Sequence, residues 1–417
     1  MNILDDLQWR GLIQDSTDLD ALAAHLDSGR ITFYVGFDPT AASLHVGHLT
    51  QALTARRLQL AGLRPLLLVG GATGMIGDPR ESDERVLNAP EVVAGWVDQI
   101  RQQLRPFVTY EGDNAATLVN NLDWTGEMSA IDFLREVGKH FPVNKMLARE
   151  VVRARLESGI SFTEFSYQLL QSNDFYELHR RHGCTLQFGG SDQWGNITSG
   201  VDYVRRRGAG PVHAFVTPLV TTADGKKIGK TEGNATWLDA TMTSPYAFYQ
   251  FWFNADDRDI GMFLRRFSFK THDEILQLEK ATQDKPAARQ AQRALAAELT
   301  TLLHGETECA QVIAASQALF GRGDLAELSQ ATLGAALAEA GTVDIDGEPP
   351  TLAWAFKETG LVSSLSEARR TVKEGGAYLN NVRVEDADQP LSAEHLLHGT
   401  YAVLRRGKKT IAGVVRR

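Results

Sequence analysis

The chain has 417 residues, of which 43% are hydrophobic and 23% charged, and its formal net charge is −9. This length predicts two to four domains, and the composition is that of a soluble globular protein. No apolar run approaches the ~20 residues that span a bilayer, and the start MNILDDLQWRGL lacks the pattern of a secretory leader. The only two cysteines are far apart, which argues against a disulfide framework and a structural zinc site. We therefore expect a cytoplasmic protein without membrane association.

The first predicted elements are a strand and a helix joined by a turn that contains two histidines. Residues 31–40, ITFYVGFDPT, form an apolar β-rich run, and LTQALTARRLQLAG continues with helical spacing to Gly62. Between them, LHVGHL at 44–49 lies where the helix begins, and a helix N-terminus offers N–H groups and positive potential to an anion. The pattern predicts a phosphate site, and the alternative is two surface histidines around a glycine.

Residues 1–220 alternate strand-like and helix-like runs, as in a parallel sheet connected by crossover helices. The strand-like runs are TFYVGF, RPLLLVGG, TLQFGG and HAFVTPLV. Within this region, residues 110–180 are rich in helical apolar spacing, as in FLREVGKHFPVNKMLAREVVRARLESG. The predicted fold class is α/β, with a Rossmann-like parallel-sheet domain that contains a helical insertion.

A second candidate for anion binding is the polar loop DGKKIGKTEGN at 224–234. Lys226, Lys227 and Lys230 are close together in it, and their ammonium groups repel each other unless an anion joins them. The loop links two apolar segments, VHAFVTPLVT and TSPYAFYQFW, which predicts a mobile connector between packed units. The simpler alternative is a solvated basic turn.

Three regions are predicted after the sheet domain. Residues 221–320 hold the lysine loop and mostly helical sequence, and residues 321–350 are rich in small residues, which predicts a linker. Residues 351–417 predict a small α+β module with a helix and a hairpin around Asn380-Asn381. This module carries a net charge of +4, which leaves −13 for the rest of the chain. A basic module on an acidic body is typical of RNA binding, and a solvated appendix without function is the alternative.

Taken in order, HVGH and KIGKT resemble the two signature motifs of class I aminoacyl-tRNA synthetases, the second being a variant of their Lys-Met-Ser-Lys-Ser loop. More segments resemble the bacterial tyrosyl-tRNA synthetase family: the strand end Tyr34–Asp38, GGATGMIGDP at 70–79, SFTEFSYQLLQSNDF at 161–175 and QFGGSDQWGNI at 187–197. The resemblance covers essentially the whole chain. It implies a ligase that activates L-tyrosine with ATP to tyrosyl-adenylate and pyrophosphate, and then transfers tyrosine to the 3′ end of tRNA(Tyr).

The resemblance also implies cofactors and partners. Mg²⁺ is expected with ATP as a substrate, whereas no tightly bound cofactor and no structural metal are expected. The insertion at 110–180 is expected to form a homodimer interface. The helical region at 221–320 is expected on the anticodon side of tRNA, and the module at 351–417 resembles an RNA-binding module of a ribosomal small-subunit protein. Its Arg369, Arg370 and Lys373, with Arg405, Arg406, Lys408 and Lys409 near the end, are the expected contacts to tRNA phosphates.

Both steps of this reaction develop charge on phosphoryl oxygens, so catalysis is mainly positioning and electrostatic stabilisation. Thr40 and His45 at the helix start are expected on the γ-phosphate side, and Gly47 and His48 on the adenine and ribose side. The lysine loop is expected to close over pyrophosphate with Lys227, Lys230 and Thr231. The resulting catalytic candidates are Thr40, His45, His48, Lys227, Lys230 and Thr231. The candidates for ATP binding are Gly36, Asp38, Gly47, Asp192 and Lys230.

The tyrosine pocket must meet the phenol with groups that phenylalanine would leave unpaired, and the ammonium with acceptors. The resemblance implies Tyr34 and Asp174 at the phenol. It implies Asp78, Tyr167 and Gln171 around the ammonium and Gln193 at the carboxylate. Tyr167, Gln171 and Asp174 fall at i, i+4 and i+7, so one helix face presents all three. Taken singly, Tyr34 would be a core residue of a strand, whereas a buried carboxylate at Asp174 requires partners.

One stretch departs from the family pattern. Many members have a lysine shortly after Gly-Asp-Pro, followed by Glu-Arg, but this chain reads GDPRESDERV, one residue shorter and without the lysine. Arg80 lies in this stretch, and Arg85 matches the later arginine of the family. Whether either arginine replaces the lysine in stabilising pyrophosphate stays open.

Three alternative functions share some of these features. Tryptophanyl-tRNA synthetases have the same fold and signatures, but Tyr34 with Asp174 and the basic module argue against them. Cytidylyl- and adenylyltransferases also use HxGH, but such chains are usually shorter and need no basic module. A non-enzymatic RNA-binding protein with a decayed synthetase body is opposed by the two intact signatures.

Overall fold

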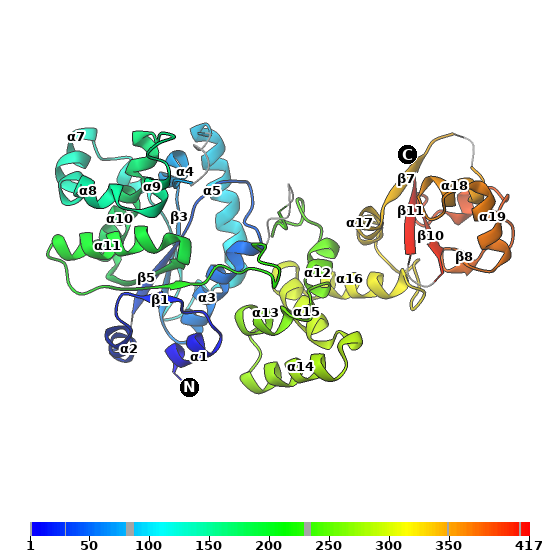
Figure 1. Cartoon of the computed structure of the whole chain (residues 1–417), viewed down its shortest axis with the longest axis horizontal. Coiled ribbons are helices and arrows are strands. Elements are labelled where there is room, and N and C mark those ends of the chain that lie inside the picture. Colours follow the sequence, from blue (N-terminus) through cyan, green and yellow to red (C-terminus); the bar gives the residue numbers. More distant parts are fainter. Residues whose placement is uncertain (1, 30, 81–86, 229–234, 348–349, 408–409) are drawn as a thin grey trace. The chain divides into compact units, whose positions relative to one another are not determined.

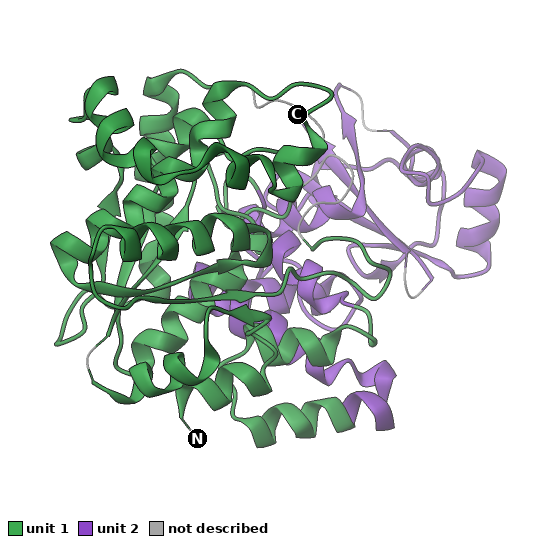
Figure 2. Cartoon of the chain, turned by 60° about the vertical axis from the view of Figure 1, so that its left-hand side comes forward, with its two compact units in different colours: residues 1–242, 256–280 green, residues 243–255, 281–417 purple. Residues whose placement is uncertain are grey.

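The computed structural model describes residues 2–29, 31–80, 87–228, 235–347, 350–407 and 410–417 (Figure 1). The chain divides into two compact units, shown in two colours in Figure 2. Unit 1 comprises residues 1–242 and 256–280, and unit 2 comprises residues 243–255 and 281–417. Residues 221–242 and 256–280, which were predicted as part of the second region, thus belong to unit 1. Among the described residues, no helix is long and apolar enough to cross a membrane.

Unit 1 is built on a six-stranded sheet in the order β1-β6-β5-β2-β3-β4. All neighbouring strands are parallel except β1, which is antiparallel to β6. The strands are β1 Asp15–Ser16, β2 Thr32–Phe37, β3 Arg64–Val69, β4 Thr117–Asn120, β5 Cys184–Gly190 and β6 His213–Thr217. The four predicted strand runs are therefore confirmed as β2, β3, β5 and β6.

The crossover helices cover both faces of this sheet. In Figure 1, α3 and α5 lie on one side of it and α10 and α11 on the other. The helices of unit 1 are α1 Ile3–Trp9, α2 Leu19–Asp27, α3 Leu49–Leu60, α4 Thr73–Ile76, α5 Pro90–Leu104, α6 Leu122–Thr125, α7 Ala130–Asp132, α8 Val143–Leu147, α9 Glu150–Ala154, α10 Phe162–His182, α11 Trp194–Arg206, α13 Ile260–Phe267 and α14 His272–Asp284, whose last turn belongs to unit 2. The strand order reverses between β2 and β5, and ligands bind at such switch points in open α/β sheets.

Successive side chains of β2 point to opposite faces of the sheet, and one of these faces contributes Tyr34 to the candidate site. Phe33 packs towards Phe188, whose ring stacks on Phe215 at 5.2 Å between centroids. Tyr34 points to the opposite face, where its ring lies 5.4 Å from that of Phe175 on α10. Because successive residues of a strand face opposite sides, β2 sends Tyr34 under the helix that also carries Asp174.

Helix α10 has well-defined ends. The side chain of Ser161 accepts a hydrogen bond from the Glu164 backbone N–H, and Gly183 ends the helix in the left-handed region with φ of +64°. The predicted helical insertion at 110–180 is observed as α6 to α10, although its first part contains β4 of the sheet.

Unit 2 contains a group of helices and a five-stranded sheet in the order β7-β11-β10-β8-β9. Its helices are α12 Pro245–Phe253, α15 Gln290–His304, α16 Glu306–Ala318, α17 Gln330–Ala340, α18 Leu352–Glu358 and α19 Leu365–Lys373. Its strands are β7 Thr342–Ile345, β8 Ala377–Leu379, β9 Val382–Arg383, β10 Tyr401–Arg406 and β11 Thr410–Arg416. Asn380 and Asn381 have positive φ between β8 and β9, so the predicted hairpin is confirmed.

The predicted linker at 321–350 is wrong for residues 330–345. It contains α17, whose Leu333 and Leu337 are buried, and β7, which pairs in parallel with β11. The small residues there allow close packing. A Cβ at Gly334 would lie only 2.5 Å from the Tyr401 hydroxyl oxygen, so a larger side chain has no room.

Candidate active site

The predicted site residues of unit 1 gather at the carboxyl ends of the central strands. Asp38 and Thr40 follow β2, Asp78 follows β3 after a short helix, and Asp192 and Gln193 follow β5. Gly36 is exposed near the end of β2, and Thr40 is exposed in the turn, where its N–H donates to the carbonyl of Asp38 at 2.9 Å. These positions surround the switch point of the sheet.

The first signature forms a 3₁₀ turn, Val46–His48, that leads into α3. His45 Nδ1 accepts a hydrogen bond from the Gly47 N–H at 3.0 Å, and the His45 N–H donates to His48 Nδ1 at 3.1 Å. Because both Nδ1 atoms act as acceptors, neutral rings carry their protons on Nε2. The two Nε2–H groups are donors of the kind that phosphate oxygens accept.

Gly47 brings the two signatures close together. A Cβ there would lie 2.7 Å from His45 Cε1 and 3.6 Å from the carbonyl oxygen of Ile228. The flanks of the lysine loop are fixed beside the first signature, since the Val46 N–H donates to Thr236 O at 2.9 Å and the Leu238 N–H donates to Leu44 O at 2.8 Å. Lys227 is exposed, whereas Lys230 and Thr231 lie outside the described residues.

Tyr34 on β2 and Asp174 on α10 form a buried polar pair between the sheet and the helix. The Tyr34 hydroxyl is buried and has no hydrogen-bond partner among the residues that the structure describes. Asp174 accepts hydrogen bonds from Trp124 Nε1 at 2.9 Å and Asn121 Nδ2 at 3.0 Å. Burial raises the pKa of Asp174 to about 7, although these two donors act in the opposite direction. Burial and the nearby Asp174 charge also raise the pKa of Tyr34.

Asp38 links the predicted ATP residues to the predicted tyrosine residues. Its Oδ2 accepts from the Tyr167 hydroxyl at 2.6 Å, and its Oδ1 accepts from Thr73 Oγ1 at 2.7 Å. Thr73 in turn accepts from Asn121 Nδ2 at 2.9 Å. One hydrogen-bonded network therefore reaches from the turn after β2 to Asp174.

Asp78 is the centre of a second network. Gln193 Nε2 donates to its Oδ2 at 2.7 Å, and Asn196 Nδ2 donates to its Oδ1 at 3.1 Å. Burial raises the pKa of Asp78, which these donors and the Arg149 charge partly offset. The side-chain oxygen of Gln171 is buried without a partner among the described residues. Asp192 is exposed beside these groups.

Sequence reasoning missed the residues that hold the predicted ones in place. They are Thr73, Asn121, Trp124, Arg149 and Asn196. Asn121 follows β4 directly, so its place at the carboxyl end of a parallel strand was a usable signal. Trp124 gave no such signal, because only the fold brings it to Asp174 across 50 residues.

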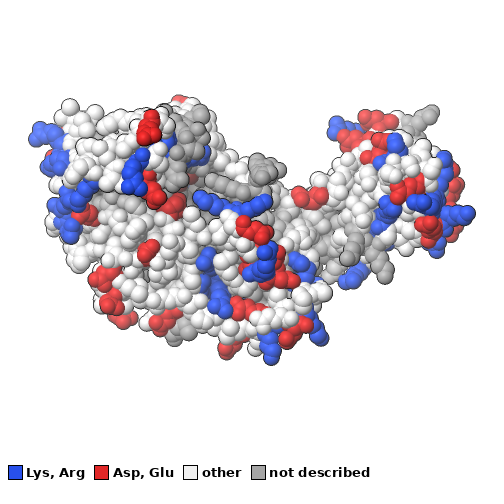
Figure 3. Space-filling view, in the orientation of Figure 1, with Lys and Arg blue, Asp and Glu red and all other residues white. Residues whose placement is uncertain are grey.

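The predicted tRNA contacts of unit 2 are only partly available. Arg370 and Lys373 are exposed on α19, but Arg369 donates to Asp388 with distances of 2.8 to 3.1 Å. The prediction for Arg405 is wrong, because its side chain is buried over the Tyr378 ring. Figure 3 shows both signs of charge interspersed around α18 and α19 on the face in view. Lys408 and Lys409 lie outside the described residues.

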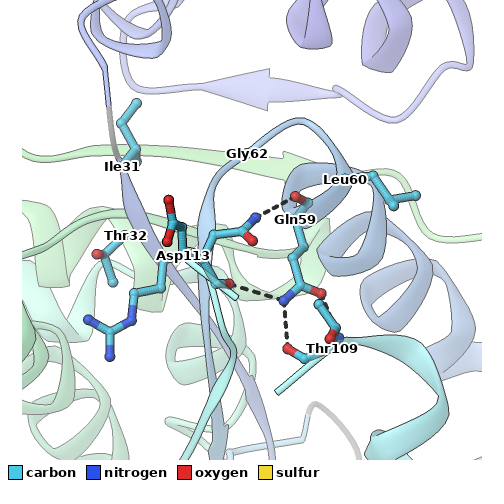
Figure 4. A pocket seen from close by; sticks show the side chains of 9 residues that line it. Ile31, Thr32, Gln59, Leu60, Gly62, Thr109 and Asp113 are labelled. Atoms are coloured by element: carbon cyan, nitrogen blue, oxygen red, sulfur yellow. Dashed lines mark hydrogen bonds between the residues drawn. The ribbon is translucent and has the colours of Figure 1, made fainter. Parts of the chain in front are cut away.

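A hollow of about 660 Å³ lies at the other end of the unit 1 sheet (Figure 4). Ile31, Thr32 and Arg64 border it at the amino ends of β2 and β3, together with Gln59 and Asp113. None of the predicted site residues lines this hollow.

Two family models match the chain. The model for class I tRNA synthetases of the W and Y type matches residues 26–321, and the model for a C-terminal domain of tyrosine–tRNA ligases matches residues 333–413. A tyrosine–tRNA ligase of Streptomyces griseus is 63% identical over 99% of this chain and 98% of that relative. One of Thermobifida fusca is 58% identical over the full length of both chains.

Solved structures give the same result for the fold. A C-terminally truncated mitochondrial tyrosyl-tRNA synthetase of Aspergillus nidulans has a TM-score of 0.70 and 32% identity, covering 76% of this chain and 94% of that one. A tryptophanyl-tRNA synthetase of Plasmodium falciparum, at 14% identity and a TM-score of 0.55 over 79% of this chain and 87% of that one, shares the fold alone. The full-length likeness to relatives of one activity leads to one conclusion: the chain belongs to the tyrosyl-tRNA synthetase family of class I aminoacyl-tRNA synthetases and is a tyrosine–tRNA ligase.

Proposed function

We propose that tyrosine binds in unit 1 with its phenol between Tyr34 and Asp174. The buried Tyr34 hydroxyl, which has no hydrogen-bond partner among the described residues, carries this proposal, because burying an unsatisfied hydroxyl costs about 1–3 kcal/mol. A ligand phenol accepts a hydrogen bond from Tyr34 and donates one to Asp174. Phenylalanine satisfies neither group, so the same pair selects tyrosine.

At the other end of tyrosine, the ammonium is assigned to Asp78, Tyr167 and Gln171, and the carboxylate to Gln193. Asp78 supplies a buried carboxylate, and the oxygen of Gln171, which has no partner among the residues described, supplies an acceptor. The existing Gln193 contact to Asp78 brings the carboxylate-binding amide beside the ammonium site. Tyrosine thereby provides partners for polar atoms at both ends of the pocket.

ATP is assigned to the first signature and the lysine loop. The Nε2–H groups of His45 and His48 and the hydroxyl of Thr40 donate to phosphate oxygens, while Gly47 leaves room for the base. The remaining assigned ATP contacts are Gly36, Asp38, Asp192, Lys227, Lys230 and Thr231. Mg²⁺ enters as the ATP complex, because this ion keeps several waters and phosphate oxygens and needs only one or two protein carboxylates.

The reaction proceeds without a protein nucleophile. The tyrosine carboxylate attacks the α-phosphorus, the bond to the bridging oxygen breaks, and pyrophosphate leaves with the displaced electron pair. The imidazole donors and lysine ammonium groups offset the charge that grows on the phosphoryl oxygens. The terminal ribose hydroxyl of tRNA then attacks the acyl carbon, and AMP leaves.

We assign the exposed apolar side chains of the insertion to a homodimer interface. Large apolar residues concentrate there: Ile131, Leu134, Val143, Leu147, Leu156 and Phe162 are exposed. Phe162→Asp should give a monomer in analytical ultracentrifugation. Leu60→Asp is the matched control, because Leu60 is 70% exposed and Phe162 72%, but Leu60 lies outside the insertion. A dimer that survives Phe162→Asp would contradict this interface.

We place the enzyme in the cytoplasm and assign tRNA binding to unit 2, with Arg370 and Lys373 as phosphate contacts. The double charge reversal Arg370→Glu, Lys373→Glu should weaken tRNA binding and flatten its salt dependence, since phosphate contacts release counterions. Glu374→Gln on the neighbouring position is the control, and it should not weaken binding. If the double variant bound tRNA with unchanged affinity, the assignment of Arg370 and Lys373 as phosphate contacts would be wrong.

Exchange of labelled pyrophosphate into ATP tests the activation step directly. With Mg²⁺ and each of the twenty amino acids in turn, tyrosine alone should drive exchange. Exchange driven by tryptophan would refute the pocket assignment, and exchange without an amino acid would indicate a nucleotidyltransferase reaction. Lys230→Ala should slow exchange much more than it weakens tyrosine binding, because its ammonium meets charge that grows in the transition state.

A further inference from the structure

A buried guanidinium group joins two walls of the proposed tyrosine pocket. Arg155 lies directly after α9, and its side chain is 5% exposed. Its Nη1 lies 3.4 Å from Oε2 of Glu164, whose side chain is 1% exposed. Nη1 also donates to the carbonyl oxygen of Arg80 at 2.9 Å, and Nε donates to that of Gly159 at 3.1 Å.

One of these walls is the face of α10. Glu164 lies in the first turn of the helix, and Tyr167 and Gln171 follow at i+3 and i+7. Residues at this spacing share one helix face. The contact to Arg155 therefore fixes the start of the same face that presents the proposed ammonium contacts.

The other wall is the segment that carries Asp78. Residues 77–80 belong to no helix or strand, so few backbone hydrogen bonds hold them. The Arg155 guanidinium contacts this segment at Arg80, two residues beyond Asp78. Asp78 itself is held by the side chains of Gln193 and Asn196.

The chemistry of this contact requires arginine. A guanidinium presents five N–H groups in a rigid fork, so it reaches a carboxylate and two carbonyl oxygens on three segments at once. A lysine ammonium has the same charge but lacks the fork. Stability alone does not explain such a pair, because replacing a buried ion pair by apolar side chains of similar size often leaves a protein equally stable.

We propose that Arg155 is a positioning residue for tyrosine, which sets the separation between Asp78 on one wall and Tyr167 and Gln171 on the other. The inference rests on the proposed function of these three pocket residues. Arg155 itself contacts no substrate, and its effect on tyrosine binding acts through Asp78.

Equilibrium dialysis of L-tyrosine with Arg155→Lys tests this role. The Kd for tyrosine should rise roughly tenfold, while the KM for ATP in pyrophosphate exchange stays unchanged, because only the ammonium end of the pocket is displaced. Circular dichroism verifies folding at the assay temperature. Glu164→Gln, which keeps the side-chain shape and removes the charge, replaces Arg155→Lys if that variant does not fold.

Arg10→Lys is the matched control. Arg10 is another buried arginine, it pairs with Asp6, and it donates to carbonyl oxygens of Arg265, Ser268 and Lys270. These partners include none of the pocket residues. Arg10→Lys should lower the melting temperature without changing the Kd for tyrosine. An equal rise in Kd for both variants would reduce Arg155 to a general structural role and overturn the proposal.

The variant Asp78→Asn separates this inference from the site assignment. If Asp78→Asn leaves the Kd for tyrosine unchanged, the assignment of Asp78 itself fails. If Asp78→Asn weakens binding but Arg155→Lys does not, only the positioning role fails. In the Asp78→Asn background, Arg155→Lys should change the Kd by less than twofold, because coupled residues are not additive. A full tenfold effect in that background would show that Arg155 does not act through Asp78.

Discussion

Two regions of the unit 1 sheet differ in how far their polar side chains are satisfied: the hollow at the amino ends of β2 and β3, and the site around Tyr34 and α10. At the amino ends, the hollow of about 660 Å³ is lined in part by the side-chain amides of Gln59 and Asn114, which already have hydrogen-bond partners. Gln59 accepts from the Thr109 N–H at 2.8 Å, and its Nε2 donates to Thr109 O at 2.8 Å and Asn114 O at 3.1 Å (Figure 4). Above the middle of the sheet, the Tyr34 hydroxyl and the Gln171 oxygen are buried without partners among the described residues.

The difference shows that the volume of a hollow is a poor guide to function in this fold. Buried polar atoms without partners are costly, and a protein keeps them where a ligand completes their hydrogen bonds. The walls of the amino-end hollow offer a ligand little, because their side-chain amides stabilise the loop after α5. Substitutions at matched positions in the two regions test this comparison.

The largest effect is expected from exchanging one carboxylate in each region for an amide. Asp174→Asn turns an acceptor of two hydrogen bonds into a group whose NH₂ faces the donor of Trp124 or Asn121. We expect kcat/KM for tyrosine in pyrophosphate exchange to fall about 10³-fold, because the variant has a mismatched buried hydrogen bond and also loses the contact to the phenol. Asp113→Asn, at the amino-end hollow, should leave kcat/KM for tyrosine unchanged. Similar losses in both variants would contradict the comparison.

Two glutamines give the next contrast. Gln59→Leu removes three hydrogen bonds and should lower the free energy of unfolding by about 2–4 kcal/mol, without changing the KM for tyrosine. Gln171→Leu removes an oxygen for which the described residues offer no partner, so stability should hold while the KM for tyrosine rises. Urea titration and exchange kinetics of both variants measure the two quantities. A stable Gln59→Leu with altered tyrosine binding would reverse the assignment of the two regions.

A smaller effect than those of the two pairs of substitutions is expected from pH: the affinity for tyrosine should change roughly tenfold between pH 6 and pH 8. The pKa of Asp174 is raised to about 7 from the usual 3.8, so the carboxyl is neutral below that pH and ionised above it. The ionised form accepts the phenol more strongly, so affinity should rise with pH. Asp38 and Glu177 carry the other charges that raise this pKa. Affinity measured across this range should become flat in Asp174→Asn.

The same raised pKa affects the stability of the fold in the opposite direction, because stability should fall as pH rises. Because the pKa of Asp174 is higher in the folded chain, the folded state binds more protons between pH 4 and pH 7. The contribution of Asp174 to stability is therefore lost as pH rises through about 7. Comparing the urea midpoints of the parent and Asp174→Asn over this range checks the sign.

Tyr34→Phe should have the smallest effect. It removes one neutral hydrogen bond to the phenol and should cost about 0.5–1.5 kcal/mol in the preference for tyrosine over phenylalanine. Stability should not fall, because the hydroxyl has no hydrogen-bond partner in the part of the chain that the structure describes. The ratio of kcat/KM for the two amino acids gives the value. An unchanged ratio would mean that other groups read the phenol.

Sequence reasoning located residues that act through local patterns. The family resemblance implied the roles of Tyr167, Gln171 and Asp174, and their spacing then placed all three on one helix face. The strand before His45 needed only the local pattern of apolar residues. Trp124 was missed because its partner Asp174 is 50 residues away and no periodicity encodes such a contact, whereas Asn121 was missed although it directly follows a strand of the sheet. The linker prediction failed at Gly334 for a related reason: small residues mark close packing as well as flexibility.

The sheet of unit 2 has an unusual order of assembly. Strand β11, Thr410–Arg416, is the last of its five strands along the chain, yet it lies between β7 and β10. During translation, β7 has no neighbour until about 70 further residues have been made, so this sheet is completed only when its final strand leaves the ribosome. A frameshift within residues 410–416 would therefore leave β7 without its neighbour and turn β10, which still pairs with β8, into an open edge prone to aggregation.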